Sequence, residues 1–381
     1  MRILKRALLA VLIIFVVLVI TCAGVIYYYQ APLAVLVRNT AQLYGLKVLF
    51  PGVGPIVQQV VSTPGDPSKT GVILRPKNGG AYPGVLIVNG TEVQGGWRNS
   101  AVYTFAKSIA EIGEVVFVPD LPGLRYGDLS TETLSSLDQD VRWFHSYKYV
   151  KAGHVVLAGI CVGGSLALLS AERVGSMDVS GVVALDPYAS IKDLLAAVTT
   201  NIGPSYSGTP MSFHMIWWAK DVVLRSLVYL AVPSAYQYLF FEAIKHSPQL
   251  HPLDYFRTHT PPSFMPSTVK RFWYLLANTQ YSKFATLYSE LPSNVRMLFH
   301  VFSPVDNISS LHIPILIAAP MHDFAFPQGE SPKLKKANSA VQLTMTDALD
   351  HVTPTITPQI LAGYWQLLQF AKAGTNLIGT A

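Results

Sequence analysis

One segment of the 381-residue chain restricts the possible folds more than any other, the run HVVLAGICVGGSLALLS at positions 154–170. Residues 154–159 are mostly apolar and predict a buried strand, and a helical pattern begins near Gly164. The turn between them reads G-x-C-x-G-G and has Cys161 at its centre. Such a turn holds its central residue in a strained conformation above the sheet, and glycines flank it because larger side chains would collide with the strand or the helix. The segment therefore predicts a nucleophile elbow with Cys161 at its tip.

Cys161 allows two interpretations. At the N-terminus of a helix, partial positive charge favours the thiolate, which is the nucleophilic form of cysteine. The alternative is a small, buried hydrophobic residue without a chemical role. The choice depends on whether the sequence also supplies a base and an orienting acid, because a cysteine nucleophile needs both.

Two residues further along the chain meet that requirement. Asp323 follows the predicted strand 313–320, and His351 follows the predicted strand 341–348. Both lie at the carboxyl ends of strands, the edge at which parallel sheets hold their sites. Their order, nucleophile then acid then histidine, is the order that such an elbow requires. We therefore expect Cys161, Asp323 and His351 to form a catalytic triad.

Other residues compete for the role of the acid. Asp186 also follows a predicted strand and is an alternative, although we favour Asp323. Asp347 and Asp350 are close to the histidine in the sequence, but we expect them to be solvated charges of a loop.

A triad of this kind also needs two N–H groups that hold the negative oxygen of the intermediate. One is the amide of Val162, directly after the nucleophile. The second is expected from Gly90 or Thr91, which follow an earlier strand. No His, Cys and Asp cluster has the spacing of metal ligands, so the sequence predicts neither a metal nor an organic cofactor.

Short apolar strands alternate with helical patterns from about residue 56 onward. We predict strands at 71–76, 84–90, 114–123, 154–159, 181–187, 313–320 and 341–348, and helices at 99–113 and 131–147. Nearly continuous apolar strands separated by helices indicate an α/β fold with a mostly parallel sheet and helices on both faces.

The alternation breaks between about residues 190 and 310, where the chain becomes irregular and aromatic. We interpret this stretch as a helical cap inserted after the strand predicted at 181–187. The apolar run 212–241 resembles a second membrane span, but charged residues and a proline interrupt it, and a span here would separate the last two strands from their sheet. Some of its aromatic residues are expected to pack the cap onto the sheet. Others, Trp217 and Trp218 among them, are expected to line a pocket for apolar acyl or aromatic groups.

The N-terminus carries twenty consecutive uncharged residues at positions 7–26. As a helix this run would be about 30 Å long, the thickness of a bilayer core. Arg2, Lys5 and Arg6 precede it, which predicts a cytoplasmic N-terminus and a catalytic domain on the opposite side of the membrane. A cleaved signal peptide and a lipid-modified Cys22 are the alternatives.

Composition narrows the class of protein further. Half of the residues are hydrophobic and 13% are charged, which excludes disorder and favours contact with lipid. The net charge of +6 is spread without basic clusters, so we expect no nucleic-acid partner. With only two cysteines, one of them in the apolar N-terminal run, the fold is expected to have no disulfide.

From about residue 56 to 372 the chain resembles the α/β-hydrolase superfamily. The resemblance rests on the segments VPDLPGLRYGD and GICVGG and on the order of Asp323 and His351. With cysteine in place of serine at the elbow, the chain is similar to two branches of this superfamily. The dienelactone hydrolases share G-x-C-x-G-G and lack a large cap, whereas the polyhydroxyalkanoate synthases share the box and carry a long insertion before the Asp. The 162 residues from Cys161 to Asp323 (323 − 161) match the second branch better. Outside the elbow the chain shows little of the synthases' sequence, and a membrane anchor is not typical of them.

The resemblance implies an enzyme that hydrolyses a small, hydrophobic ester or thioester through an acyl-cysteine, and the predicted anchor would make it membrane-bound. An acyltransferase with the same triad and a non-catalytic binding protein of the same fold are the alternatives. We expect these parts: a transmembrane anchor at 1–30, a juxtamembrane linker at 31–55, an α/β-hydrolase core at 56–190 and 310–372, and a helical cap at 191–309.

Overall fold

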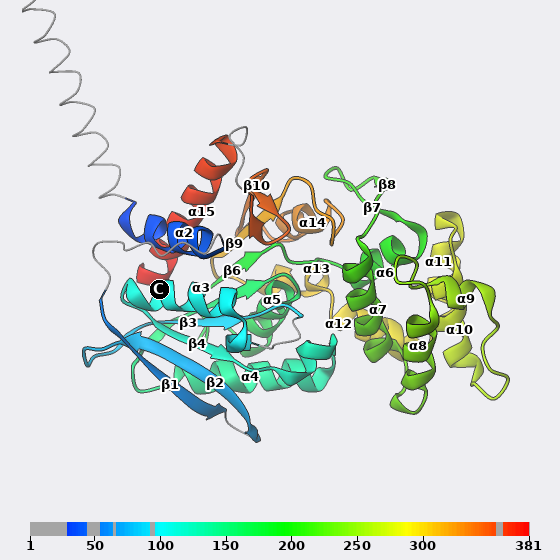
Figure 1. The fold of residues 1–381 in the computed structure, drawn as a ribbon, viewed down its shortest axis with the longest axis horizontal. Coiled ribbons are helices and arrows are strands. Elements are labelled where there is room, and N and C mark those ends of the chain that lie inside the picture. The colour runs from blue at the N-terminus through cyan, green and yellow to red at the C-terminus, as the bar shows by residue number, and fades with distance from the viewer. Residues whose placement is uncertain (1–28, 44–53, 64–65, 92–95, 356–360, 381) are drawn as a thin grey trace, which may run out of the picture.

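A computed structural model describes residues 29–43, 54–63, 66–91, 96–355 and 361–380 (Figure 1). The predicted transmembrane anchor lies almost wholly outside these residues. No helix in the described ranges is both long enough and apolar enough to cross a bilayer.

The core is one eight-stranded sheet with the order β1-β2-β4-β3-β5-β6-β9-β10. β2 pairs antiparallel with both β1 and β4, and the pairs from β4 through β10 are parallel, so the predicted mostly parallel sheet is confirmed. The strands are β1 (Ile56–Thr63), β2 (Asp66–Pro76), β3 (Tyr82–Val88), β4 (Val115–Pro119), β5 (Val150–Ile160), β6 (Gly181–Leu185), β9 (Ile315–Pro320) and β10 (Val341–Thr346). The sequence analysis did not predict β1, whose middle residues are exposed.

Helices cover both faces of this sheet, as predicted (Figure 1). Alternate residues of each strand point to opposite faces. In β3, Val85 and Ile87 pack toward α3 (Ser100–Glu111) and α15 (Leu361–Thr380). Leu86 and Val88 belong to the opposite core, which contains side chains of α4 (Thr131–His145) and α5 (Val162–Val174). The central strands are therefore buried on both sides, which explains their continuous apolar sequences.

The first part of the predicted linker at 31–55 is helical. Gln30–Leu43 forms helix α2, which packs against α3 and α15. Ala34 and Val35 are buried in that contact, so this segment is part of the folded core and not a tether.

Between β6 and β9 the chain forms helices with one small two-stranded sheet. The elements are α6 (Ile191–Thr200), β7 (Ile202–Pro204), β8 (Pro210–Ser212), α7 (Trp217–Ala231), α8 (Ser234–His246), α9 (Asp254–Thr258), α10 (Ser267–Ala277), α11 (Tyr281–Ser289), α12 (Ser293–Val301) and α13 (Pro304–Asn307). They form the lobe to the right of the sheet in Figure 1. The apolar run that resembled a second span is two helices, α7 and α8, separated at Val232 and Pro233.

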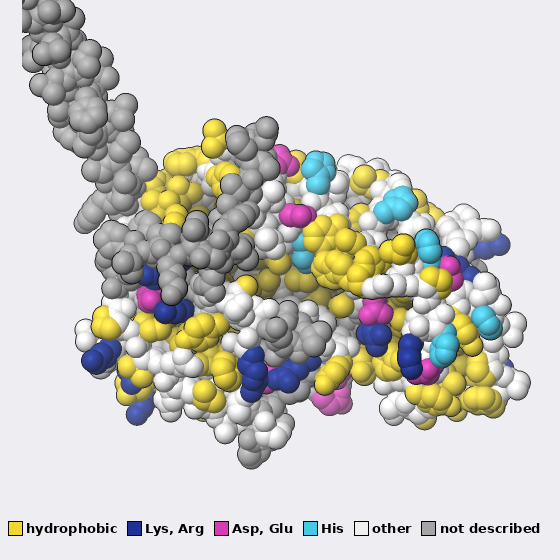
Figure 2. Space-filling model, in the orientation of Figure 1, with side chains coloured by type: hydrophobic (Ala, Val, Ile, Leu, Met, Phe, Trp, Pro, Cys, Tyr) yellow, Lys and Arg dark blue, Asp and Glu magenta, His cyan; other side chains and the backbone are white. Residues whose placement is uncertain are grey.

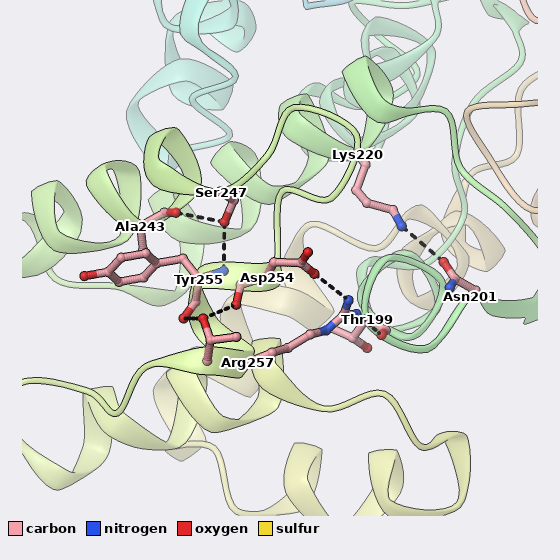
Figure 3. A network of polar contacts seen from close by, with 9 residues as sticks. Thr199, Asn201, Lys220, Ala243, Ser247, Asp254, Tyr255 and Arg257 are labelled. Carbon is pink, nitrogen blue, oxygen red and sulfur yellow. Dashed lines mark hydrogen bonds and ion pairs between the residues drawn. The ribbon is translucent and has the colours of Figure 1, made fainter.

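Aromatic packing and polar contacts hold this lobe together. The ring of Phe240 lies 5.4–5.8 Å from those of Phe256, Phe272 and Trp273. Polar contacts join distant segments in the same region (Figure 3). Arg257 of α9 donates to the carbonyl oxygen of Thr199 at 3.2 Å, and Lys220 of α7 donates to Asn201 at 3.1 Å. These contacts fix α7 and α9 against the end of α6.

The last elements complete the core. α14 (Glu330–Ala337) connects β9 to β10, and the short pair β11 (Leu349–Asp350) and β12 (Thr353–Pro354) follows β10. A 3-10 turn at Pro122–Tyr126 follows β4, another lies at Gly96–Arg98, and a third at Ile308–Ser310.

Helix α5 lies so close to β3 that a side chain cannot fit between them. A Cβ on Gly163 would overlap the carbonyl oxygens of Val88 and Asn89, which are backbone atoms that cannot rotate away. Gly374 in α15 has open space around its Cα instead.

We predict that Gly163→Ala lowers the free energy of unfolding by more than about 3 kcal/mol, because the whole of α5 must shift. The matched variant Gly374→Ala should be unchanged or more stable by about 0.5–1 kcal/mol, since alanine is the better helix former. Thermal and denaturant unfolding of both variants test this. Equal stabilities would contradict the close approach of α5 to β3.

Candidate functional site

The elbow has the strained conformation that the sequence predicts. Cys161 lies between the end of β5 and the start of α5 with φ 56° and ψ −127°. Its amide donates to the carbonyl oxygen of Leu185 at 2.8 Å, and its own carbonyl oxygen accepts from Gly164 at 2.8 Å. A Cβ on Gly159 would overlap the backbone of Gly163, so the flanking glycines are required by space. A positive φ is costly for cysteine and persists only where the surroundings impose it.

His351 lies in the tight turn between β11 and β12 and is 5% exposed. It too has a positive φ, of 55°. The Cys161 side chain is one of the groups that raise the pKa of the imidazole, so the predicted nucleophile lies beside the predicted base. The rings of Phe324 and Phe326 pack on the imidazole at 5.5 and 5.4 Å between centroids. These rings exclude water from much of the histidine.

The structure brings two acids to the same ring nitrogen. The Oδ1 atom of Asp323 lies 3.2 Å from Nδ1 of His351, and the Oδ2 atom of Asp186 lies 2.6 Å from it. Asp323, the predicted acid, also accepts the N–H groups of Ala325 at 3.0 Å and Phe326 at 2.7 Å. Asp186, treated in the sequence analysis as the competitor, is therefore also part of the cluster.

The electrostatics of the cluster follow from burial and from these contacts. Burial by itself would lower the pKa of His351, but the neighbouring Cys161 side chain and the contacts with Asp186 and Asp323 raise it overall. Burial and the nearby charge of Asp323 raise the pKa of Asp186 well above its ordinary value. Burial would also raise the pKa of Asp323, yet its contacts with His351 and with the backbone lower it overall. The charged imidazolium form of His351 is thus strongly favoured.

The amides expected to hold an oxyanion lie beside the nucleophile. Val162 is the first residue of α5 and is buried. A Cβ on Gly90 would be 3.2 Å from the Cβ of Cys161, which places the backbone of Gly90 against the nucleophile. The Thr91 hydroxyl and the Asn89 side-chain nitrogen are buried without a hydrogen-bond partner in the described part of the chain. Asn89 was not among the predicted site residues, although its position at the end of β3 is the signal that could have indicated it.

The two predicted pocket residues differ in their relation to the site. Trp218 packs edge-on against Phe324 at 5.6 Å between centroids, and Phe324 in turn packs on His351. Trp217 is 37% exposed, and no contact described for it reaches the catalytic cluster. Figure 2 shows hydrophobic side chains gathered between the core and the helical lobe on this face. Trp218 is therefore connected to the histidine through a single aromatic ring.

Among the residues that the structure describes, one group could present ligands to a metal ion: Asp186, Asp323 and His351. Their facing atoms are engaged with one another at 2.6 and 3.2 Å. These are the contacts of an imidazole held by carboxyl groups, and we assign the cluster to that role.

Comparisons with known proteins agree with this architecture. The sequence matches the model of the alpha/beta hydrolase family over residues 85–363, which is most of the chain. A search of curated proteins gives no significant match.

Several solved structures are similar to this chain at low identity. Dipeptidyl peptidase 4 from Porphyromonas gingivalis is 12% identical with a TM-score of 0.48, over 87% of this chain and 36% of that chain. A protein described as a dipeptidyl aminopeptidase IV from Bacteroides ovatus is 12% identical with a TM-score of 0.50, over 86% and 36%. A protein described as a dienelactone hydrolase from Klebsiella pneumoniae is 15% identical with a TM-score of 0.45, over 84% and 99%.

This chain therefore spans about a third of the length of the two peptidases. At such identities the likeness concerns the fold alone. The family match over most of the chain, on a sheet with the predicted elbow, supports the predicted class of enzyme. The chain belongs to the alpha/beta hydrolase family and is a hydrolase.

Proposed function

We propose that this protein hydrolyses small-molecule esters or thioesters with a hydrophobic acyl group, through a triad of Cys161, His351 and Asp323. One observation carries the proposal: the cysteine at the tip of a strained elbow lies beside an imidazole whose Nδ1 atom is 3.2 Å from the carboxylate of Asp323. This is the arrangement of a nucleophile, its base and the acid that orients the base.

The first half of the reaction forms the acyl-enzyme. The Cys161 thiolate attacks the carbonyl carbon, a carbon–sulfur bond forms, and the carbonyl oxygen takes up the electron pair. The amide of Val162 and an amide of the loop at Gly90 or Thr91 stabilise this oxyanion. When the intermediate collapses, the bond to the leaving alcohol or thiol breaks, and His351 gives that group its proton.

The second half releases the acid. His351 accepts a proton from water, the resulting hydroxide attacks the acyl carbon, and the carbon–sulfur bond breaks. Asp323 keeps the imidazole oriented and stabilises its charged form throughout. The products are a carboxylic acid and the free enzyme, and the chemistry requires no cofactor.

The substrate class follows from the surroundings of the histidine. Phe324, Phe326 and Trp218 form an apolar wall on that side of the cluster. Such a wall favours acyl or aromatic groups over small polar substrates.

We predict that an activated ester forms an adduct on Cys161 that intact-mass spectrometry detects. Cys161→Ala should lose the adduct and the hydrolysis. The matched control is Cys22→Ala, which removes the other cysteine of the chain and should leave both intact. An adduct that persists in Cys161→Ala would refute the assignment of the nucleophile.

We further predict that kcat/KM for p-nitrophenyl esters rises from acetate toward medium and longer acyl chains. Each methylene that becomes buried should contribute up to about 0.8 kcal/mol, a factor of about four. Trp218→Ala should weaken this preference more than Trp217→Ala, because Trp218 packs on the ring that contacts His351. A flat profile, or one that peaks at acetate, would show that these aromatic residues only pack the cap.

We propose in addition that residues 7–26 anchor the enzyme as a single-pass membrane protein with a cytoplasmic N-terminus and the catalytic domain on the other side. Support comes from the uncharged length of this run and from the basic residues before it. After alkaline carbonate extraction the full chain should stay in the membrane pellet, and a chain without residues 1–28 should be released. Release of the full chain would exclude the anchor.

A further inference from the structure

Two buried carboxyl groups share one nitrogen of His351. The side chain of Asp186 is 6% exposed and that of Asp323 is 3% exposed, and both approach Nδ1. Orienting an imidazole takes one carboxylate. The second group therefore needs a separate explanation.

The two groups cannot both be charged at neutral pH without a large cost. Two carboxylates in one buried site repel, and one of them keeps its proton. Their oxygens and Nδ1 lie within 4.8 Å of one another, so the two carboxyl groups and the imidazole form one close cluster. The cluster is therefore expected to hold one negative charge between two side chains.

Backbone contacts distinguish the two. The carboxylate of Asp323 accepts two backbone N–H groups, from Ala325 and Phe326, and such bonds stabilise the ionised form. The Oδ2 atom of Asp186 lies 2.6 Å from Nδ1 of His351, and no backbone N–H group donates to it among the described residues. The charge is thus better placed on Asp323.

The backbone holds Asp186 in position at some cost. Asp186 has a φ of 47°, and its amide donates to the carbonyl oxygen of Ala318 at 2.7 Å. The segment after it is fixed by Glu330, whose carboxyl group accepts the amides of Ala189 at 2.7 Å and Ser190 at 2.8 Å. Strain that the surroundings maintain in this way is typical of functional positions.

We propose that Asp186 is a positioning residue whose protonated carboxyl group connects His351 to the carboxylate of Asp323. Its carbonyl oxygen accepts the Nδ1–H group, and its hydroxyl donates to Asp323. The pair then carries one negative charge, which matches the single positive charge of the imidazolium. The opposite pKa directions of Asp186 and Asp323 agree with this assignment.

Other titratable groups act on the same pair within the described residues. Tyr206 reaches over from the β7–β8 hairpin and donates its hydroxyl to the carbonyl oxygen of Met321, and burial is the main cause that raises its pKa. Asp347 acts on Tyr206 from the turn after β10, and Cys161 acts on the imidazole from the elbow. None of these groups replaces the proton that the two carboxyl groups share in this proposal.

The first test rests on the proposed triad. It uses asparagine as a mimic of a protonated aspartate. In Asp186→Asn the amide oxygen can still accept Nδ1–H and the amide N–H can still donate to Asp323. We expect kcat/KM to fall less than tenfold. The double variant Asp186→Asn/Asp323→Asn removes the negative charge and should fall by about 10³–10⁴-fold. An Asp186→Asn enzyme as inactive as the double variant would show that Asp186 is the ionised acid and would overturn the proposal.

Two further variants complete the set. Asp186→Leu removes the acceptor of Nδ1–H and should lose clearly more activity than Asp186→Asn. Asp347→Asn removes an exposed carboxylate near the same turn and should behave like the unmodified enzyme. If Asp186→Leu and Asp186→Asn were equally active, Asp186 would have no part in positioning His351.

A second measurement does not depend on catalysis. A carboxyl group that stays protonated in the folded protein costs stability as pH rises above its unfolded pKa of about 3.9, because only the unfolded chain ionises. Asp186→Asn removes this cost, so its melting temperature relative to the unmodified protein should rise from pH 5 to pH 8. A difference that does not change with pH would overturn the proposal even if the enzyme were active. If the triad itself is wrong, this trend would still appear.

Discussion

The close approach of three backbone segments is the constraint on which the rest of the site depends. The end of β5 and the first turn of α5 meet at Gly159 and Gly163, and α5 also contacts the end of β3. Because no side chain fits between them, the turn that joins β5 to α5 cannot relax. Cys161 is consequently held at a positive φ, and the backbone of Gly90 lies directly against it. The position of the nucleophile is therefore a result of packing in the core.

The acid–base part of the site shows the same kind of constraint. Among the described residues other than glycine, four have a positive φ, and Cys161, Asp186 and His351 are three of them. They come from three different turns at the same edge of the sheet, which is where a parallel sheet collects the ends of its strands. Strain concentrated in this way is maintained by the surrounding fold, and it places a thiol on one side of an imidazole and carboxyl groups on the other.

The helical insertion gives this edge its apolar character. Trp218, at the start of α7, reaches the histidine through Phe324 of the core. The insertion has its own aromatic core around Phe240, and polar contacts of Arg257 and Lys220 hold its helices to the end of α6 (Figure 3). It can therefore present a fixed surface to a substrate.

Local sequence determined the parallel sheet, the elbow and the candidate triad, because period, glycine spacing and position after a strand are properties of short segments. It favoured Asp323 over Asp186 but could not show how their surroundings differ, since both follow buried strands and the difference is a set of backbone N–H groups supplied by the fold. It also could not place Gln30–Leu43 against the core, because that packing depends on partners in α3 and α15, far away in the sequence. Tertiary structure decided what depends on distant contacts: the second carboxyl group on the histidine, the aromatic wall beside it and the extent of the core.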